Sequence, residues 1–284
     1  MRVVTDHISA EDFEVRRCAG CDLVYISDAP IASELGRYYD NPAGAIMHRS
    51  PSALIVKARA VMMRREVKAL AAFVPAGATI LDFGAGDGSL ARVLTAAGYD
   101  CYAADLYPEE RWSVPGVPYH QYAPDLDVKG FLGDLPRLNA ITMRHVLEHV
   151  LEPRALLAAF AEAEVDYVSL VVPNIESRLA KRLGSAWYYW DPPRHLTFFS
   201  PETLTTTANS AGFDVARLDL VGLDELATSA HRQLLLRAHR APRPRPLEMK
   251  VAEVLRPTGI ISSVSSAVSA GPGRATIKAV LRRR

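Results

Sequence analysis

Leu81-Asp82-Phe83-Gly84-Ala85-Gly86-Asp87-Gly88 is the stretch that decides the fold of this chain. It follows the apolar run of residues 78–81 and precedes a helical pattern over residues 90–97, which ends at Gly98. The order predicts a strand, a glycine-rich turn and a helix, because glycine has no Cβ and adopts backbone conformations that other residues avoid. Such a turn lets a ligand approach bare backbone. The residues expected to meet this ligand are Gly84, Ala85, Gly86 and Gly88.

A second carboxylate follows the next apolar run, residues 99–104. Asp105 comes about 20 residues after the first glycine of the turn, where an acid suits a ribose diol. Two ribose hydroxyls can donate hydrogen bonds to one carboxylate. Leu106 follows Asp105 and is expected at the same edge of the sheet. Together these features predict a site for a nucleoside-containing cofactor.

The spacing of the glycines and the acid before them narrow the choice of cofactor. The dinucleotide fingerprint is G-x-G-x-x-G, whereas this turn has G-x-G-x-G with Asp82 two residues before the first glycine. A carboxylate at that point repels a pyrophosphate. It suits S-adenosylmethionine, which carries an ammonium and a sulfonium and no phosphate. We expect Asp82 to hold the ammonium directly or through water.

Three motifs in this order resemble the class I S-adenosylmethionine-dependent methyltransferases. They are the glycine turn of residues 81–88, then Ala104-Asp105-Leu106, then Val146-Leu147-Glu148-His149-Val150. The resemblance covers roughly residues 55–220 and implies S-adenosylmethionine as cofactor. It also implies that the third motif lines the pocket. From it we expect His145 to contact the cofactor and Glu148 the substrate.

Strand and helix patterns alternate through the middle of the chain. Strands are predicted over residues 78–83, 100–104, 119–122, 139–144, 166–172 and 213–220. Helices are predicted over residues 52–73, 89–97 and 153–163, and from Pro201 to Gly212. This alternation predicts an α/β fold with a doubly wound, mostly parallel sheet, whose ligands bind at the carboxyl ends of the strands. The resemblance adds a seventh, antiparallel strand at residues 275–281.

The predicted organisation has three parts. Residues 1–50 form an N-terminal segment, residues 51–223 the cofactor-binding core, and residues 224–284 a helical insertion followed by the last strand. Cys18 and Cys21 have the spacing of a zinc knuckle, but a structural zinc needs four ligands and only His7 is near in sequence. Some sugar methyltransferases similar to this chain carry two such cysteine pairs. The upstream pair is absent here, so we expect a degenerate knuckle without metal.

His145-Val-Leu-Glu148-His149 matches the H-x-x-E-H pattern of some zinc proteases. That chemistry needs both histidines on one helix, whereas these residues follow a predicted strand. We therefore expect no metal here either.

An unusual loop, Trp187-Tyr-Tyr-Trp190-Asp-Pro-Pro-Arg194-His195, is the candidate acceptor site. Tyr189 and Trp190 are expected to stack on a sugar or planar ring, and Arg194 to hold an anionic group. His195 has the ordinary pKa of a base that takes a proton from a hydroxyl or acidic C–H. In related methyltransferases a histidine in a similar context lies near the acceptor, and in some sugar C-methyltransferases it is the base. The alternative to an acceptor site is a surface loop whose aromatic side chains pack against the core.

The predicted function is methyl transfer from S-adenosylmethionine to a small-molecule or glycan-like acceptor, by O- or C-methylation with His195 as base. A sugar or nucleotide-sugar is the favoured acceptor. Two alternatives stay open at this point. One is a non-catalytic partner with the same fold in a biosynthetic assembly, and the other is a nicotinamide oxidoreductase.

Composition limits the remaining partners. The chain has 284 residues and a formal net charge of +1, so charge gives no drive towards nucleic acid. No secretory signal and no run of about 18 apolar residues is visible, so we expect a cytoplasmic protein without a transmembrane segment. Basic residues gather at 237–245 and 282–284. Such runs are usually solvated, and the alternative is contact with an anionic membrane surface. The sequence does not indicate an oligomeric state.

Overall fold

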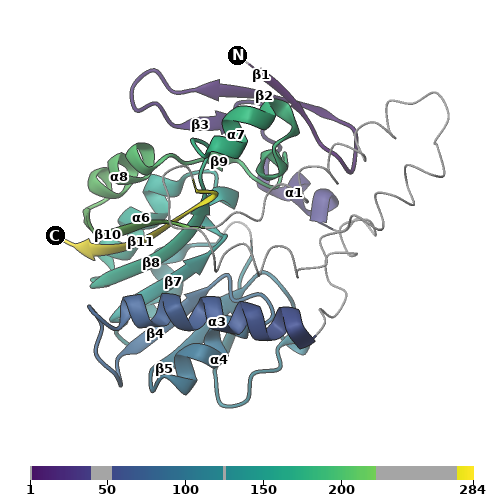
Figure 1. Ribbon diagram of the computed structural model, residues 1–284. Helices are drawn as coiled ribbons and strands as arrows, with labels where there is room; N and C mark the ends of the chain where they lie inside the picture. Colours follow the sequence, from purple (N-terminus) through teal and green to yellow (C-terminus); the bar gives the residue numbers. More distant parts are fainter. Residues whose placement is uncertain (1, 40–52, 124–125, 222–273) are drawn as a thin grey trace. The chain divides into compact units, whose positions relative to one another are not determined.

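The computed structural model of the protein (Figure 1) describes residues 2–39, 53–123, 126–221 and 274–284. The chain divides into two compact units, each built from separate stretches of sequence. The N-terminal unit consists of Met1–Val56, Pro173–Ser200 and Leu220–Ile277. The sheet unit consists of Lys57–Val172, Pro201–Asp219 and Lys278–Arg284.

A seven-stranded sheet is the framework of the sheet unit (Figure 1). Its spatial order is β10-β11-β8-β7-β4-β5-β6. The strands are β4 (Thr79–Phe83), β5 (Asp100–Asp105), β6 (Tyr119–Gln121), β7 (Ala140–Arg144), β8 (Tyr167–Pro173), β10 (Phe213–Val221) and β11 (Thr276–Arg283). The pairs β4–β5, β4–β7, β5–β6 and β7–β8 are parallel. The predicted doubly wound, mostly parallel sheet is therefore confirmed.

The last strand, β11, is antiparallel to its neighbour β8. Arg283 N–H donates to Asp166 O at 2.9 Å, and Asn174 N–H donates to Ala275 O at 2.8 Å. The two bonds pair a late residue of one strand with an early residue of the other, which is the antiparallel arrangement. The prediction of an antiparallel final strand at residues 275–281 thus matches the observed element.

The central strands β4, β7 and β8 are mostly buried on both faces, as helices on both sides require. In β4 the side chains of Ile80, Leu81, Asp82 and Phe83 are all buried. Figure 1 shows α3 and α4 on one face of the sheet and α6 and α8 on the other. The helices are α3 (Ala53–Leu70), α4 (Ser89–Ala96), α5 (Val128–Gly133), α6 (Pro153–Glu162) and α8 (Pro201–Ser210). Buried side chains of α3 and α4 form one core with β4 and β5: Met63, Val67, Leu70, Leu90, Leu94, Ile80 and Cys101.

The order of the strands places a topological switch at the carboxyl end of β4. From β4 the chain moves outward to β5 and β6, and it then returns to form β7 on the other side of β4. In register, Phe83 lies opposite Ala104 of β5, and Asp82 lies opposite Thr142 of β7. The glycine turn, Asp105 and the segment after Arg144 therefore emerge at the same edge, where ligands bind in open α/β sheets.

The N-terminal unit contains a second, antiparallel sheet in the order β1-β2-β3-β9. Its strands are β1 (Arg2–Thr5), β2 (Asp12–Arg17), β3 (Val24–Ile26) and β9 (Thr197–Phe198). Alternate side chains such as Val4, Phe13 and Val15 point into a core that they share with Trp187 and Trp190. The sequence analysis did not foresee that residues 173–200 fold together with the N-terminus, because β9 is only two residues long.

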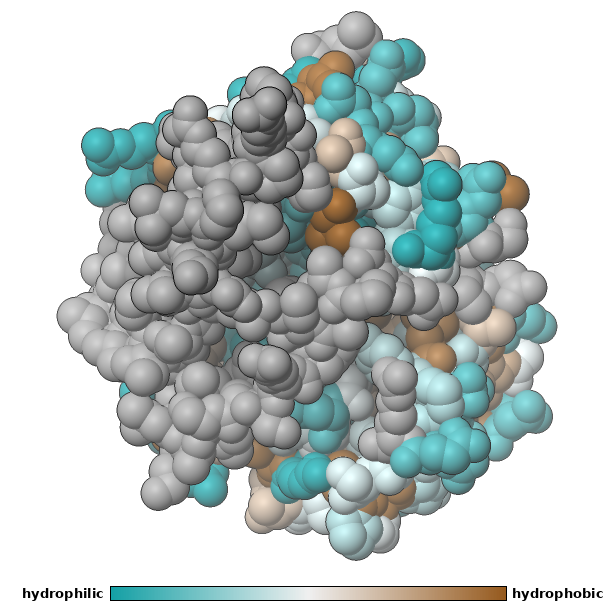
Figure 2. Space-filling model, turned by 90° about the vertical axis from the view of Figure 1, so that its right-hand side faces the viewer, coloured by the Kyte–Doolittle hydropathy of each residue, from teal (hydrophilic) through white to brown (hydrophobic). Residues whose placement is uncertain are grey.

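The predictions for the insertion, the basic runs and membrane contact are tested only in part by the described residues. The predicted insertion at 224–271 and the basic run at 237–245 lie outside the described residues. At the other basic run, Arg283 pairs with Asp166 and Arg284 with Asp214. None of the described helices combines the length and the apolar character that a membrane crossing requires. Large exposed apolar side chains, such as Ile31 at 65%, are scattered along the described sequence. On the face shown in Figure 2, the brown hydrophobic residues appear as separate spots among the coloured residues.

Candidate functional site

The glycine turn after β4 adopts a backbone that only glycine takes without strain. Gly84, Gly86 and Gly88 have φ angles of 76°, 56° and 70°. A residue with a Cβ loses roughly 1–2 kcal/mol in this left-handed region. The three glycines are therefore required by the path of the chain as it leaves β4 and enters α4.

Two of the glycines are also required by packing, and the third faces open space. A Cβ on Gly84 would lie 2.3 Å from Val146 Cγ2, and one on Gly88 would lie 2.2 Å from Val114 Cγ2. A Cβ on Gly86 would meet no atom of the described residues within 4 Å. Gly86 is thus the point of the turn where a ligand can reach the backbone.

Asp105 joins the ends of β4 and β5. Its Oδ2 accepts a hydrogen bond from Gly86 N–H at 2.7 Å, and its Oδ1 accepts from Leu106 N–H at 2.7 Å and from Tyr107 N–H at 3.3 Å. The side chain is 7% exposed. A carboxylate offers about four acceptor positions, so Asp105 can hold both loops and still accept from a ligand hydroxyl. The predicted residues Gly86, Asp105 and Leu106 are brought together.

Asp82 lies beneath this turn as a fully buried carboxyl group. Thr142 Oγ1–H donates to its Oδ1 at 2.9 Å, and its Oδ2 makes no hydrogen bond of normal geometry in the described part of the chain. Burial raises the pKa of Asp82 to about 7, the hydrogen bond from Thr142 opposes this, and the charge of Asp105 adds to it. A cation bound nearby would stabilise the ionised form. Asp82 therefore fits a positively charged ligand and not a pyrophosphate.

His145 and Glu148 form a pair directly after β7. His145 Nδ1 lies 3.0 Å from Glu148 Oε1, and Glu148 is 1% exposed. His145 has a φ of 56°, which is uncommon for a residue with a side chain and is typical of functional turns. Val146, the next residue, is the one that packs against Gly84. Glu148 thus orients His145, which belongs to the same edge as the glycine turn.

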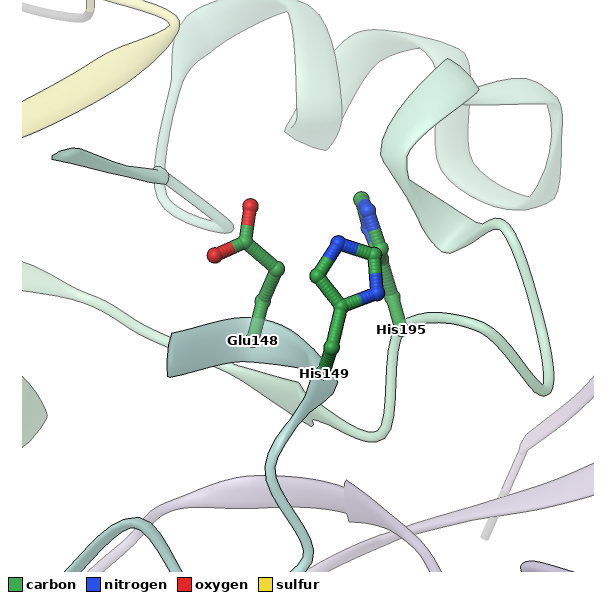
Figure 3. A group of neighbouring side chains, drawn as sticks. All are labelled: Glu148, His149 and His195. Atoms are coloured by element: carbon green, nitrogen blue, oxygen red, sulfur yellow. The ribbon is translucent and has the colours of Figure 1, made fainter. Parts of the chain in front are cut away.

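The segment 145–149 is not a protease helix. Leu147–His149 form only a short 3-10 helix, η3, and Figure 3 shows Glu148 and His149 leaving it as neighbours. Figure 3 also draws His195, which belongs to the N-terminal unit. The zinc-protease interpretation is therefore excluded by local structure, as expected.

A small cavity in the sheet unit is lined in part by Thr142, the hydrogen-bond partner of Asp82. It has a volume of about 10 Å³ and is lined by residues that include Glu66, Thr142 and Arg144. Arg144 Nε and Lys278 Nζ lie 3.3 Å and 2.6 Å from the carboxylate of Glu66. Such a volume holds about one water molecule, so this cavity is too small for a nucleoside.

The aromatic loop belongs to the N-terminal unit, where Trp190 is a core residue. It is 3% exposed, its Nε1–H donates to Gly184 O at 2.7 Å, and its ring centre lies 4.6 Å from that of Phe198. Tyr189 packs against the same core, with its ring centre 5.5 Å from that of Trp187. These contacts argue against the predicted role of Trp190 in stacking on an acceptor and favour the pinned-loop alternative for this side chain.

His195 is held at both its backbone and its ring. Its N–H donates to Asp191 O at 2.9 Å, and its Nδ1 lies 2.9 Å from Tyr189 O. A carbonyl oxygen only accepts, so Nδ1 must carry the hydrogen and Nε2 has the lone pair when the ring is neutral. This tautomer is the one that a general base needs at Nε2.

Arg194 is committed to partners within the protein. Its Nε and Nη2 donate to the two oxygens of Asp191 at 3.0 and 2.6 Å, Nη2 also donates to Asp6 Oδ1 at 2.5 Å, and Nη1 donates to Tyr38 O at 3.4 Å. Burial opposes ionisation of Asp191, but the charge and hydrogen bonds of Arg194 outweigh it and hold the pKa of Asp191 below its ordinary value. This geometry argues against the predicted binding of an anionic acceptor by Arg194.

The described part of the N-terminal unit holds two sets of side chains that could bind a metal: the cysteine pair and one group of carboxylates with a histidine. Cys18 and Cys21 lie on the turn between β2 and β3, where Cys18 N–H donates to Leu23 O at 2.9 Å. Neither cysteine joins a group of three ligand side chains among the described residues. Asp6, His7 and Asp191 do form such a group, but Arg194 already neutralises both of its carboxylates.

Comparison with known proteins identifies the family. Residues 56–218, more than half of the chain, match a family described as "Methyltransferase domain". The chain belongs to this family, and the predicted class, an enzyme that uses S-adenosylmethionine as methyl donor, is confirmed. No curated protein sequence matches the chain significantly.

Similar solved structures have the same fold. The 1,6-didemethyltoxoflavin-N1-methyltransferase of Burkholderia thailandensis has a TM-score of 0.51 and 16% identity, over 95% of this chain and 99% of that one. A cyclopropane-fatty-acyl-phospholipid synthase-like protein from Lactobacillus casei has a TM-score of 0.51 and 16% identity, over 82% and 94%. A putative sarcosine dimethylglycine methyltransferase from Galdieria sulphuraria has a TM-score of 0.50 and 13% identity, over 79% and 84%. At these identities the likeness shows the fold alone.

Three residues of importance were missed by the sequence analysis: Thr142, Asp6 and Asp191. Thr142 sits within a predicted strand, and the register of a parallel sheet is not readable from one strand. Asp6 meets Arg194 across 188 positions of sequence, and no local pattern reports such a contact. Asp191 lies inside the quoted loop, where its spacing of three residues from Arg194 was an unused signal.

We predict that Gly86→Ala weakens cofactor binding by more than its small loss of stability explains. Gly98 also has a positive φ, 87°, and open space around a new Cβ, so Gly98→Ala is the matched control. Both changes should cost about 1 kcal/mol of unfolding free energy in denaturant titrations. Only Gly86→Ala should weaken S-adenosylmethionine binding in calorimetry, by about tenfold or more, because its methyl group enters the ligand's space. Equal affinity in Gly86→Ala and wild type would contradict the assignment.

We predict that Asp82 makes cofactor affinity depend on pH. Its carboxyl group, with a pKa of about 7, must lose a proton before it holds a cation. Affinity should therefore fall as the pH is lowered below about 7, by up to about tenfold per pH unit. Calorimetry of wild type and Asp82→Asn should show a sloping profile for the first and a flatter, weaker one for the second.

The stability of the ligand-free protein provides the control for the Asp82 prediction. A raised pKa means that the folded chain holds this proton more tightly than the unfolded chain. The stabilisation is complete below the ordinary aspartate pKa and is lost as the pH rises through about 7. Asp82→Asn should remove this part of the pH dependence of the melting temperature. A wild-type slope that persists in the variant would show that other groups cause it.

Proposed function

We propose that the protein methylates a small-molecule acceptor at a hydroxyl or an acidic carbon, with His195 as the general base. The observation that carries the proposal is the 2.9 Å contact from His195 Nδ1 to the carbonyl of Tyr189. That contact fixes the neutral ring in the form whose Nε2 accepts a proton.

The cofactor half of the proposal rests on the sheet unit. When bound, S-adenosylmethionine supplies a methyl carbon that its sulfonium already activates. Asp105 would accept a hydrogen bond from a ribose hydroxyl at its remaining acceptor position, Gly86 would leave space for the methionine portion, and Asp82 would compensate the positive charge. His145 and Leu106, at the same edge, complete the wall of the pocket. These roles match the donor and acceptor groups that the residues present.

The acceptor half rests on the N-terminal unit. In-line displacement requires the nucleophile to be aligned, and alignment can contribute roughly 7–11 kcal/mol. A hydroxyl or carbon acid must also lose its proton, and a base typically contributes about 10²–10⁴-fold. His195 takes that proton at Nε2, while the backbone of Tyr189 and Asp191 keeps the ring in place.

The acceptor is best described as a neutral small molecule with a polar and an apolar face. Arg194 and Trp190 are both engaged inside the protein, so neither supports an anionic nucleotide-sugar. Tyr189 remains the aromatic candidate for contact with a planar or sugar ring. Glu148, which is 1% exposed and contacts His145, is better suited to positioning that histidine than to the predicted contact with the acceptor. The Burkholderia thailandensis enzyme is named for methylation of 1,6-didemethyltoxoflavin at N1, so a protein of this fold acts on a small molecule, which supports only the small-molecule part of the proposal.

We predict that His195→Gln lowers turnover by roughly 10²-fold or more and leaves cofactor affinity within about twofold of wild type. The acceptor is sought first by incubating the wild type with S-adenosylmethionine labelled in its methyl group and a panel of hydroxylated small molecules. The variant is then assayed with any compound that becomes labelled. The matched control is His120→Gln, which changes a half-buried histidine of the sheet unit and should retain full turnover.

The result that counts against the base is a His195→Gln enzyme with an unchanged rate. Cofactor binding without any transfer across the panel would instead favour a non-catalytic role. A thermal-shift comparison of S-adenosylmethionine with nicotinamide cofactors shows directly which nucleoside the turn accepts.

A further inference from the structure

A buried ionic cluster in the N-terminal unit lies next in sequence to His195. We define it as Asp6, Asp191 and Arg194, which are 0%, 8% and 8% exposed. Arg194 makes a two-pronged contact with Asp191, at 3.0 and 2.6 Å, and reaches Asp6 Oδ1 at 2.5 Å. Such paired, charge-assisted hydrogen bonds are short and directional, so they fix geometry as well as neutralise charge.

Asp6 ties this cluster to the turn between β1 and β2. Its Oδ1 accepts from Ile8 N–H at 3.1 Å, and its Oδ2 accepts from Ser9 N–H at 2.9 Å. Burial opposes ionisation of Asp6, but the hydrogen bond and charge of Arg194 outweigh it and keep the pKa of Asp6 below its ordinary value. The carboxylate therefore links two segments that are far apart in sequence: the β1–β2 turn and residues 191–194.

The same short segment controls the ring of His195. Asp191 carries the carboxylate of the cluster and also the carbonyl that accepts from His195 N–H at 2.9 Å. The carbonyl of Tyr189 contacts His195 Nδ1. The ring of Tyr189 lies nearly parallel to the imidazole, with 6.1 Å between the ring centres and 14° between the ring planes. Any shift of residues 189–194 would break the contact that selects the tautomer of His195.

We infer that Asp6 is a positioning residue for His195. Through Arg194 and Asp191 it holds the loop so that Nδ1 keeps its hydrogen and Nε2 keeps its lone pair. This inference rests on the proposed role of His195 as base. It gives the N-terminal strands a function in the reaction, because the cluster that sets the base is completed by a residue from the turn after β1.

Arg194 and Asp191 alone would not suffice for this arrangement. They are three residues apart on one loop, and their pair by itself could move as a unit. Asp6 anchors that pair to a different part of the unit through two backbone N–H donors and Arg194. The loop is then held from both sides.

The tautomer of His195 can be measured directly by nuclear magnetic resonance of protein labelled with ¹⁵N-histidine. Spectra are recorded at increasing pH until the His195 signals no longer change, so that the neutral ring is observed. His195→Gln identifies the signals of His195 by their loss. We expect the wild-type ring to carry its hydrogen on Nδ1, whereas a free imidazole prefers Nε2.

Variants then test the role of Asp6. Asp6→Asn and Arg194→Lys should each lower the ratio of the Nδ1–H to the Nε2–H form by about tenfold, since they release the loop that aligns the Tyr189 carbonyl. Asp6→Glu keeps the carboxylate and should restore most of the ratio. Asp22→Asn, an exposed aspartate on the β2–β3 turn, should leave it unchanged.

Two results would overturn the inference. One is a wild-type ring protonated on Nε2, which requires no variant. The other is an unchanged ratio in folded Asp6→Asn or Arg194→Lys protein. Because the spectra need neither cofactor nor acceptor, they are independent of turnover: an inactive protein with the expected tautomer would remove the role of His195 as base and leave the positioning by Asp6 intact.

Discussion

The hydrogen bonds that Asp105 accepts from the two loops at the end of the parallel strands are the constraint on which the site depends. Gly86 N–H and Leu106 N–H converge on one carboxylate, so the loop after β4 and the loop after β5 are fixed to each other. Parallel pairing of β4 with β5 brings these loops to the same edge. The glycines with positive φ then turn the first loop so that no described side chain fills the space where a Cβ on Gly86 would point.

Two of the buried carboxylate systems in the described part of the chain are stabilised in opposite ways. Asp191 and Asp6 share Arg194, and that guanidinium keeps both ionised despite their burial. Asp82 has a hydroxyl partner, Thr142, and its pKa rises to about 7. A satisfied ion pair is suited to holding a loop, whereas a carboxyl group without a neutralising partner is suited to receiving a cation. The contrast supports a structural role for the first system and a ligand-binding role for the second.

The sequence predicted the framework and the cofactor edge well, because their signals are local. A glycine turn between a buried strand and a helix, and an acid at the end of the next strand, are patterns within about 25 residues. The N-terminal unit was not predictable in the same way. Its sheet joins Val24 to Phe198, and its ionic cluster joins Asp6 to Arg194. Such pairings depend on tertiary contacts, and thus Arg194 and Trp190 were assigned to a ligand when their partners lie within the protein.

A crystal structure of the protein with S-adenosylhomocysteine tests the central claim most directly. The account predicts a ribose hydroxyl within hydrogen-bond distance of the Asp105 carboxylate, with the amino acid portion of the ligand against the backbone of Gly86. A nucleoside bound away from Asp105, or a turn that must reorganise before Gly86 becomes accessible, would contradict it.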